Sequence, residues 1–180
     1  MAEIPLLRPV HTDDIADIQA IYAAEVLHGT ASFELTPPTL EDMQQRRRAL
    51  EDAGYPYLVA LDSTRRICGY AYAGPYRPRP AYRFTVENSV YVAESARRRG
   101  VAGRLLAALI EACESRGYRQ MVAVIGDSAH TASIRLHQRA GFRHVGTLKH
   151  VGFKFERWLD TVIMQRPLPL DAATAVAADD

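Results

Sequence analysis

Cysteine is scarce in this sequence, and its scarcity excludes two kinds of protein. The chain of 180 residues has one tryptophan and two cysteines, Cys68 and Cys113. Two isolated cysteines form neither a disulfide framework nor the paired spacing of a zinc site, so we expect no bound metal. The sequence also lacks an apolar run of about 18 residues and a secretory signal at its N-terminus. We therefore expect a cytoplasmic protein that neither spans nor binds a membrane.

An excess of charge of either sign is absent as well. The 22 lysines and arginines balance 21 aspartates and glutamates, which gives a net charge of +1. This balance indicates no general surface for nucleic acid, so any function of the arginine clusters is local. With 48% hydrophobic and 24% charged residues, the composition is ordinary for a globular protein. We expect a single domain over residues 1–166 and a C-terminal tail over residues 167–180.

The most informative segment covers residues 88–116. It opens with a β-branched and aromatic run at residues 90–92, which predicts a buried strand. Apolar residues then recur with the spacing of one helix face, at Leu105, Leu106, Leu109, Ile110 and Cys113. Gly117 is expected to end this helix as its C-cap. Between the strand and the helix lies an arginine- and glycine-rich loop, residues 97–103.

A loop of this kind suits an anion. The first N–H groups of a helix have no partner inside the helix, and the helix dipole places about half a positive charge there. Gly100 lets the backbone approach a phosphate group closely, and the arginines at 97–99 can supply charge-assisted hydrogen bonds. The alternative is a capped helix with a solvated basic surface, and the loop alone does not decide between the two.

Apolar periodicity and turn residues predict the order of the remaining elements. Strands are expected at residues 6–9, 57–61, 67–73, 82–92, 120–125, 142–151 and 159–165. Helices are expected at residues 12–27, 40–53 and 131–140, besides the long helix after the arginine loop. Loops are expected at residues 74–80, which contain three prolines, and at residues 152–158. The predicted fold class is α+β, with a mixed, mainly antiparallel sheet flanked by helices.

The order of strand, Arg-x-x-Gly-x-Ala and long helix resembles the pyrophosphate-binding motif of the GNAT family of N-acetyltransferases. Arg97, Gly100 and Ala102 occupy its defining positions. The Rossmann dinucleotide fingerprint is the rival glycine motif, and it fits poorly because Gly-x-Gly-x-x-Gly is absent. The resemblance implies the GNAT fold, in which two central strands splay apart and admit acetyl-CoA, the co-substrate.

Further segments are similar to the phosphinothricin and methionine sulfoximine N-acetyltransferases of that family, namely residues 74–92, 122–126, 133–137 and 151–160. This similarity implies acetylation of the α-amino group of a small amino-acid-like acceptor, by direct attack of the amine on the thioester. It also implies a homodimer. Acetylation of a peptide or protein N-terminus and a non-catalytic acyl-CoA sensor are the alternatives. The proline-rich loop at residues 74–80 holds Arg77 and Arg79 stiffly, and this argues against the first alternative. A candidate catalytic pair argues against the second.

That pair is Glu87 and His137, which match the catalytic residues of the subfamily. Glu87 stands in an otherwise apolar strand, where burial would raise the pKa of its carboxyl toward that of a base working near neutral pH. The alternative is a glutamate at the strand edge that pairs with Arg79 or Arg83. His137 lies on a helix and can give or take a proton near neutral pH, although a lone helical histidine is usually structural. The sequence does not say which residue is the acid and which the base.

The resemblance also assigns binding residues. It implies that the acceptor is held by Phe33, Arg77, Arg79 and Tyr82. It implies that acetyl-CoA is contacted by Val90, Tyr91, Val92, Arg97, Arg98, Arg99, Gly100, Val101, Ala102, Gly103, His130 and Ser133. A backbone N–H near Val92 is expected to stabilise negative charge on the thioester oxygen. His130 departs from the family, which usually has asparagine there, so we expect either a weakened coenzyme contact or a simple helix cap.

Overall fold

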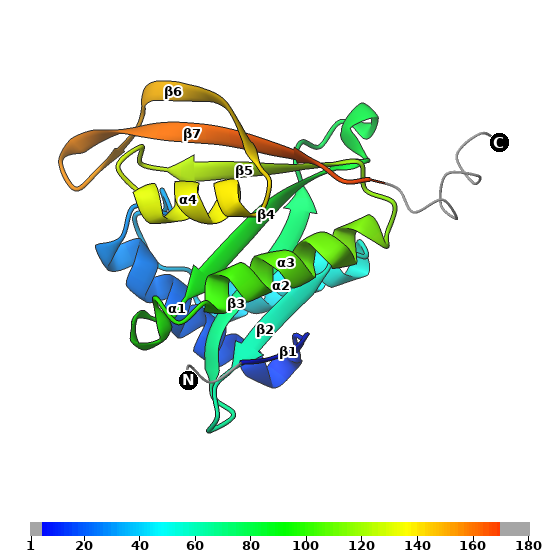
Figure 1. The fold of residues 1–180 in the computed structure, drawn as a ribbon. Coiled ribbons are helices and arrows are strands. Elements are labelled where there is room, and N and C mark those ends of the chain that lie inside the picture. The colour runs from blue at the N-terminus through cyan, green and yellow to red at the C-terminus, as the bar shows by residue number, and fades with distance from the viewer. Residues whose placement is uncertain (1–4, 170–180) are drawn as a thin grey trace.

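The computed structural model describes residues 5–169, which form a seven-stranded sheet with helices on both faces (Figure 1). The spatial order of the strands is β1-β2-β3-β4-β5-β7-β6. Their bounds are β1 (Leu6–Pro9), β2 (Tyr57–Leu61), β3 (Ile67–Pro75), β4 (Thr85–Val92), β5 (Gln120–Gly126), β6 (Arg143–Lys154) and β7 (Arg157–Pro167). Strands β4 and β5 pair in parallel, and the other neighbouring strands are antiparallel. The predicted α+β class with a mixed, mainly antiparallel sheet is confirmed.

Two buried clusters hold the helices against the sheet. Helices α1 (Ile15–His28) and α2 (Leu40–Asp52) cover one face, and α3 (Val101–Glu114) and α4 (Thr131–Arg139) lie on the other (Figure 1). The first cluster is built around Ile18, Val26 and Tyr70. The second contains the predicted apolar stripe of α3, which packs on β2, β3 and β4. The start of α2 is fixed by Thr39, whose hydroxyl oxygen accepts a hydrogen bond from the backbone N–H of Asp42 at 3.1 Å.

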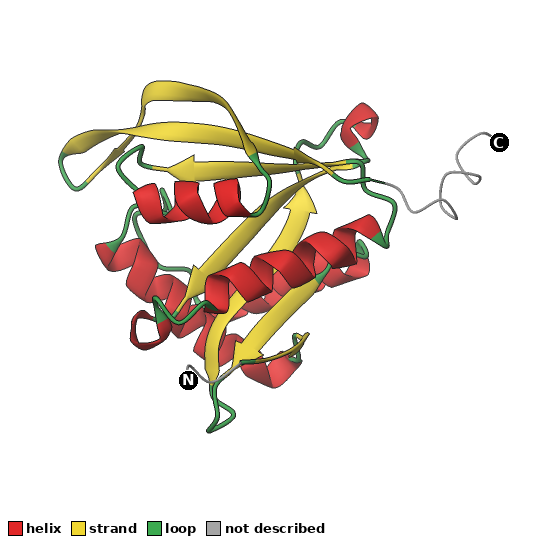
Figure 2. Cartoon of the chain, viewed as in Figure 1, coloured by secondary structure: helices red, strands yellow, loops and turns green. Residues whose placement is uncertain are grey.

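The sheet opens between its two central strands. The parallel pairing of β4 with β5 covers only four rungs, from Thr85 opposite Gln120 to Asn88 opposite Ala123. Beyond Asn88, β4 continues to Val92 beside β3, and β5 continues to Gly126 beside β7. The two strands therefore diverge as the branches of a fork, which Figure 2 shows as a widening space between them. This is the splay that the family resemblance implies.

The chain before β4 differs from the expectation. Strand β3 continues through Gly74 to Pro75, two residues past its predicted end, and β4 begins at Thr85 rather than at residue 82. Pro75 is tolerated because it is the last residue of the strand, where the missing N–H breaks no internal rung. A 3₁₀ turn occupies Pro80–Tyr82, since proline favours the first position of such a turn.

The end of α3 follows the prediction, whereas the final hairpin differs from it. The last regular residue of α3 is Glu114, and Gly117 closes the helix end with φ of 79° and an N–H that donates to the carbonyl oxygen of Glu114 at 3.0 Å. The loop expected at residues 152–158 is a turn of two residues, Phe155 and Glu156, both with positive φ. Two positive φ values match the twist of adjacent antiparallel strands, so β6 and β7 extend almost to the turn. Neither turn residue is a glycine or asparagine, and the sequence therefore carries no signal for this hairpin.

The packed part of the chain extends past residue 166. Pro167 belongs to β7, and Leu168 is buried in the core with its N–H bonded to the carbonyl oxygen of Arg119 at 2.9 Å. Residues 167–168 therefore belong to the packed chain, residues 170–180 of the predicted tail lie outside the described part, and the division into domain and tail stays a prediction. Within residues 5–169, no helix combines the length and apolar character that a membrane crossing requires.

Candidate active site

The two candidate catalytic residues lie on opposite faces of β4. Glu87 shares its face with Tyr91, which packs among the residues beneath α1 and α2, because side chains alternate along a strand. Asn88 points to the other face, where its side chain meets His137 of α4. Both positions stand at the base of the fork, since Asn88 forms the last rung between β4 and β5. A molecule in the fork can therefore reach Glu87 from one face and His137 from the other.

His137 is buried, and both of its ring nitrogens are engaged. Nδ1 lies 2.8 Å from the carbonyl oxygen of Ser133, so Nδ1 carries a hydrogen and donates it. Nε2 lies 2.9 Å from the side-chain nitrogen of Asn88, which donates to the Nε2 lone pair. Burial lowers the pKa of His137, and the hydrogen bond to Ser133 offsets part of this effect. His137 is therefore neutral near pH 7, with a lone pair at Nε2 that can accept a proton.

Glu87 is half-buried and takes part in none of the ion pairs found within residues 5–169. Burial raises the pKa of its carboxyl, and the positive charge of Arg77 opposes part of that rise. The alternative of a pair with Arg83 is not realised, because that guanidinium lies over the ring of Phe84, 4.5 Å from its centroid. An unpaired carboxylate with a raised pKa has the properties that a general base requires.

Backbone groups of β4 face the opening of the fork. The N–H of Ala93 bonds to Cys68 of β3, and the carbonyl oxygen of Thr85 accepts from Tyr76, so odd-numbered residues direct their backbone groups toward β3. By alternation, the N–H groups of Val90 and Val92 point the other way, where pairing with β5 has ended. These two N–H groups are the candidates for the expected donor near Val92, which stays a prediction. The Tyr91 side chain packs away from the opening, with its ring centroid 5.1 Å from that of Tyr22.

The arginine loop lies at the far end of the fork. Arg98 and Gly100 both adopt left-handed backbone conformations, with φ of 62° and 80°, and turn the chain sharply before α3. Gly100 is the N-cap of α3 and provides no side-chain cap, so the first N–H groups of the helix are free for a ligand. A Cβ at Gly100 would meet nothing within 4 Å, so the space beside this backbone is open. The arginines at 97–99 are exposed, and Ala102 and Gly103 form the first turn of α3.

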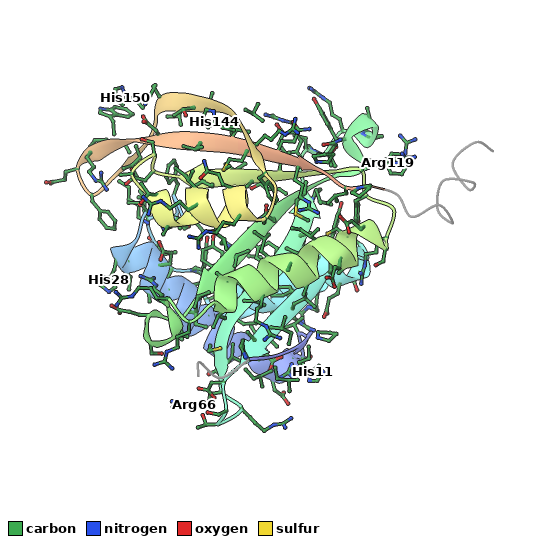
Figure 3. The ribbon with its side chains drawn as sticks, viewed as in Figure 1. His11, His28, Arg66, Arg119, His144 and His150 are labelled. Atoms are coloured by element: carbon green, nitrogen blue, oxygen red, sulfur yellow. The ribbon has the colours of Figure 1, made fainter. Side chains whose placement is uncertain are left out.

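The start of α4 carries a second polar group that a ligand could use. His130 is the N-cap of this helix, but its side chain forms no capping hydrogen bond. Its Nδ1 is buried without a hydrogen-bond partner among the described residues, so a ligand could satisfy it. The other histidines of the six, His11, His28, His144 and His150, are exposed at the periphery of the molecule (Figure 3). Among residues 5–169, no group of three or more His, Cys, Asp or Glu residues could hold a metal ion.

The connection from β3 to β4 carries the expected acceptor residues. The guanidinium of Arg77 lies over the ring of Tyr76, 5.2 Å from its centroid, and Tyr82 meets the same ring edge-on at 5.8 Å. These aromatic contacts fix Arg77 near enough to Glu87 for its charge to affect the pKa of that carboxyl. Arg79 is exposed and forms none of the ion pairs of the described residues.

Phe33 lies across the fork, on the segment between α1 and α2. Its ring fills the space beside two glycines, because a Cβ at Gly126 or at Gly152 would come within 2.8 Å or 2.3 Å of ring carbons. The preceding residue is held by Lys154, a buried lysine of β6 whose Nζ donates to the carbonyl oxygen of Ser32 at 2.7 Å. These contacts place Phe33 against the end of β5 and the β6–β7 hairpin, where it can border the acceptor.

Sequence reasoning missed two of these residues. Asn88 orients His137, and its only sequence signal is a polar side chain next to Glu87 in an apolar strand. Lys154 fixes the segment that carries Phe33, although it lies in a stretch that already resembles the subfamily. The contacts of both residues are long-range, 49 and 122 positions along the chain, so no local pattern reveals them.

Unpaired backbone groups lead from the start of α3 to the unpaired carboxylate of Glu87. Together with the similarities below, this arrangement identifies an enzyme of the acyltransferase class. The chain belongs to the Acetyltransferase (GNAT) family, whose sequence model matches residues 18–142. The predicted family and fold are thereby confirmed.

Individual relatives extend this result. The chain is 54% identical to a phosphinothricin N-acetyltransferase of Alcaligenes faecalis, over 90% of this chain and 82% of that protein. It is 43% identical to an L-methionine sulfoximine/L-methionine sulfone acetyltransferase of Pseudomonas paraeruginosa, over 88% and 92% of the two chains. Its fold matches the crystal structure of a phosphinothricin acetyltransferase from Sinorhizobium meliloti in complex with AcCoA, with a TM-score of 0.91 and 45% identity. That match covers 96% of this chain and 92% of the other.

Proposed function

We propose that this chain is an acetyl-CoA-dependent N-acetyltransferase for the α-amino group of a small amino-acid-like acceptor, of the phosphinothricin, methionine sulfoximine or methionine sulfone type. The observation that carries the proposal is the unpaired, half-buried Glu87 at the base of a fork whose far end is the uncapped start of α3. The similarity to acetyltransferases for these compounds supports the acceptor class. A cytoplasmic location remains a prediction.

The residues of the fork fit the coenzyme. Open space beside Gly100, free N–H groups at the start of α3 and exposed arginines suit a diphosphate. The partnerless Nδ1 of His130 and the backbone groups of Val90 and Val92 suit the polar atoms of the remaining chain. The thioester supplies an activated acetyl group, and the N–H of Val92 would donate to its oxygen as negative charge develops there.

Glu87 and His137 divide the proton transfers. The acceptor amine arrives protonated, and Glu87 takes the first proton so that the nitrogen lone pair can form the new bond to the acyl carbon. The nitrogen then sheds a second proton. Nε2 of His137, which is neutral with a free lone pair once Asn88 releases it, takes this proton and gives it to the sulfur that departs. Two protons leave nitrogen, one reaches sulfur, and the other passes from Glu87 to solvent.

The β3–β4 connection holds the acidic group of the acceptor. Arg77 is positioned by Tyr76 and Tyr82, and its guanidinium matches a carboxylate or phosphinate with two parallel hydrogen bonds. Arg79 supplies a second positive charge two residues along the same stiff loop. Phe33 borders the acceptor from the opposite branch of the fork.

The proposed assembly is a homodimer through the β6–β7 hairpin. Strand β6 is an edge strand, and the hairpin exposes at least half of six large apolar side chains, Val145, Leu148, Val151, Phe153, Phe155 and Trp158. A patch of this kind favours association with a second copy. Sedimentation of the protein should give twice the chain mass, and Trp158→Glu should shift it toward the monomer.

One assay tests the proposed function. Thiol release from acetyl-CoA should rise when L-methionine sulfoximine or phosphinothricin is added, with kcat/KM at least about tenfold higher than for a tripeptide with N-terminal alanine. Turnover of the peptide without response to either amino-acid analogue would overturn the acceptor class. Coenzyme binding without turnover of any acceptor would favour the sensor instead.

A further inference from the structure

Glu25, near the end of α1, contacts two segments that belong to different parts of the proposed site. Its Oε1 accepts a hydrogen bond from the backbone N–H of Ala31 at 3.0 Å. Its Oε2 lies 3.3 Å from Nη2 of Arg97, in the arginine loop before α3. The carboxylate is the more buried partner, since 14% of the Glu25 side chain is exposed against 55% of that of Arg97. One carboxylate therefore links the coenzyme loop to the segment that carries Phe33.

The segment after α1 is built around this carboxylate. Gly29 ends α1, and a Cβ at Gly29 would lie only 1.8 Å from Oε1 of Glu25. The Glu25 side chain thus occupies the place that a larger residue at position 29 would need. Because Gly29 leaves this room, the carboxylate can reach Ala31 directly.

The rest of the segment is held by contacts that do not involve the coenzyme loop. Lys154 holds the carbonyl oxygen of Ser32, and Phe33 fills the space beside Gly126 and Gly152. Glu34 receives hydrogen bonds from Arg46 at 2.7 Å and from the hydroxyl of Tyr22 at 2.9 Å. Among the contacts named here, Glu25 is the one that joins this segment to the phosphate end of the site.

We propose that Glu25 is a positioning residue that couples coenzyme binding to acceptor binding; this inference rests on the proposed function. In the free protein, Arg97 shares the charge of the Glu25 carboxylate with the N–H of Ala31. A diphosphate in the arginine loop competes for the Arg97 guanidinium. The Glu25 carboxylate then has the N–H of Ala31 as its remaining partner. Because Arg97 no longer neutralises the charge of the carboxylate, the hydrogen bond from Ala31 becomes stronger.

The sign of the coupling follows from this competition. The stronger hydrogen bond at Ala31 holds the segment that carries Phe33 more firmly when the coenzyme is bound. The acceptor therefore has a higher affinity for the coenzyme complex than for the free protein. By thermodynamic linkage, the acceptor improves coenzyme affinity by the same factor. Glu25 needs no contact with either ligand for this effect.

The test measures that factor at equilibrium, with coenzyme A in place of acetyl-CoA so that no reaction occurs. Titration calorimetry gives the dissociation constant of coenzyme A alone and in the presence of saturating L-methionine sulfoximine. In the unaltered protein, saturating acceptor should lower the dissociation constant of coenzyme A by a coupling factor of about five or more. In Glu25→Gln the amide oxygen still accepts from Ala31 but cannot form an ion pair with Arg97, so the factor should fall below about twofold.

Two measurements separate coupling from mere loss of structure. Glu25→Gln should bind coenzyme A alone at least as tightly as the unaltered protein, because Arg97 is released from its competitor. The control Glu41→Gln removes one exposed carboxylate from α2 and should leave the factor unchanged.

Turnover of L-methionine sulfoximine by the unaltered protein is measured first. Two results would refute the role of Glu25 and leave the proposed function standing. One is turnover without any effect of the acceptor on coenzyme A affinity, and the other is an undiminished coupling factor in Glu25→Gln. Absence of turnover would refute the proposed function and this inference with it.

Discussion

The side-chain nitrogen of Asn88 lies 2.9 Å from Nε2 of His137 and donates to its lone pair. This bond favours the neutral imidazole, because a donor at Nε2 would clash with the hydrogen that protonation adds there. Burial acts in the same direction and lowers the pKa of His137. Burial and the Asn88 donor therefore both favour neutral His137, and Asn88 acts from the position next to Glu87 on β4.

Replacing Asn88 by aspartate should shift the pH dependence of turnover. A carboxylate beside His137 stabilises its protonated form and should raise its pKa by about 1–3 units. Since the proposed mechanism needs neutral His137, the acidic limb of the kcat profile should move to higher pH by a similar amount. Asn88→Ser removes the donor without adding charge and should shift the limb far less. An unshifted limb in Asn88→Asp would separate His137 from the proton transfers.

Replacing Glu87 by glutamine should lower kcat about 10²–10⁴-fold, because the amide cannot accept the amine proton. The dissociation constant of coenzyme A should change less than about twofold, since Glu87 lies on the opposite face of β4 from Asn88 and α4. Glu111→Gln, an exposed carboxylate on α3, serves as the control. In the unaltered protein, activity should fall as pH drops through the raised pKa of Glu87, because the base must be ionised. Equal kcat in Glu87→Gln would remove this residue from catalysis.

Replacing Arg77 by alanine should raise the KM for the acceptor at least about tenfold, the loss expected for one charge-assisted contact. The same change removes the positive charge that opposes the raised pKa of Glu87, so the pH at which Glu87 ionises should rise. Arg79→Ala should raise the KM without moving the pH profile, because that arginine has no such effect on Glu87. Steady-state kinetics across pH distinguish the two variants. An unchanged KM in either would assign that arginine to the solvated surface.

Gly100 and Gly103, at the start of α3, provide a matched pair of substitutions with opposite expected effects on stability. Gly100→Ala should cost about 1–2 kcal/mol of unfolding free energy, because φ there is 80° and alanine resists the left-handed conformation. Gly103 lies inside α3, where an added Cβ would approach no atom closer than 4.0 Å, so Gly103→Ala should stabilise the protein by up to about 1 kcal/mol. Thermal unfolding measures both. Calorimetry should also show weaker coenzyme A binding by Gly100→Ala, and unchanged binding would place the diphosphate elsewhere.

The local signals in the sequence predicted much of the fold. Alternation and apolar periodicity located the strands at residues 6–9, 57–61 and 120–125 and the helices around them, because these elements bury one regular face. The proline-rich stretch before β4 and the Phe155–Glu156 turn were predicted wrongly. Strand β3 extends into the first because it pairs with β4 as far as Pro75, and neither Phe155 nor Glu156 is a residue type that favours positive φ.

Some residues of the candidate site could likewise be predicted from local sequence signals, and others could not. Glu87 and Gly100 stand out in the sequence, because a lone carboxylate in an apolar strand and a glycine before a helix are visible locally. The relation between Glu87 and His137 is not visible, since only the sheet shows that β4 separates them. Asn88, Lys154 and Glu25 act through partners 49, 122 and 72 positions away. Such contacts are products of tertiary packing and leave no trace in periodicity.

The early end of pairing between β4 and β5 has a consequence for recognition. Strand β5 stays fully bonded to β7 along its other edge, so the sheet tolerates the separation without losing order there. The N–H groups of Val90 and Val92 meanwhile lack the neighbour that a closed sheet would give them. A ligand with amides at peptide-like intervals can serve as a surrogate strand and complete this ladder. Recognition along the fork then depends on the spacing of main-chain groups, which most side-chain substitutions leave intact.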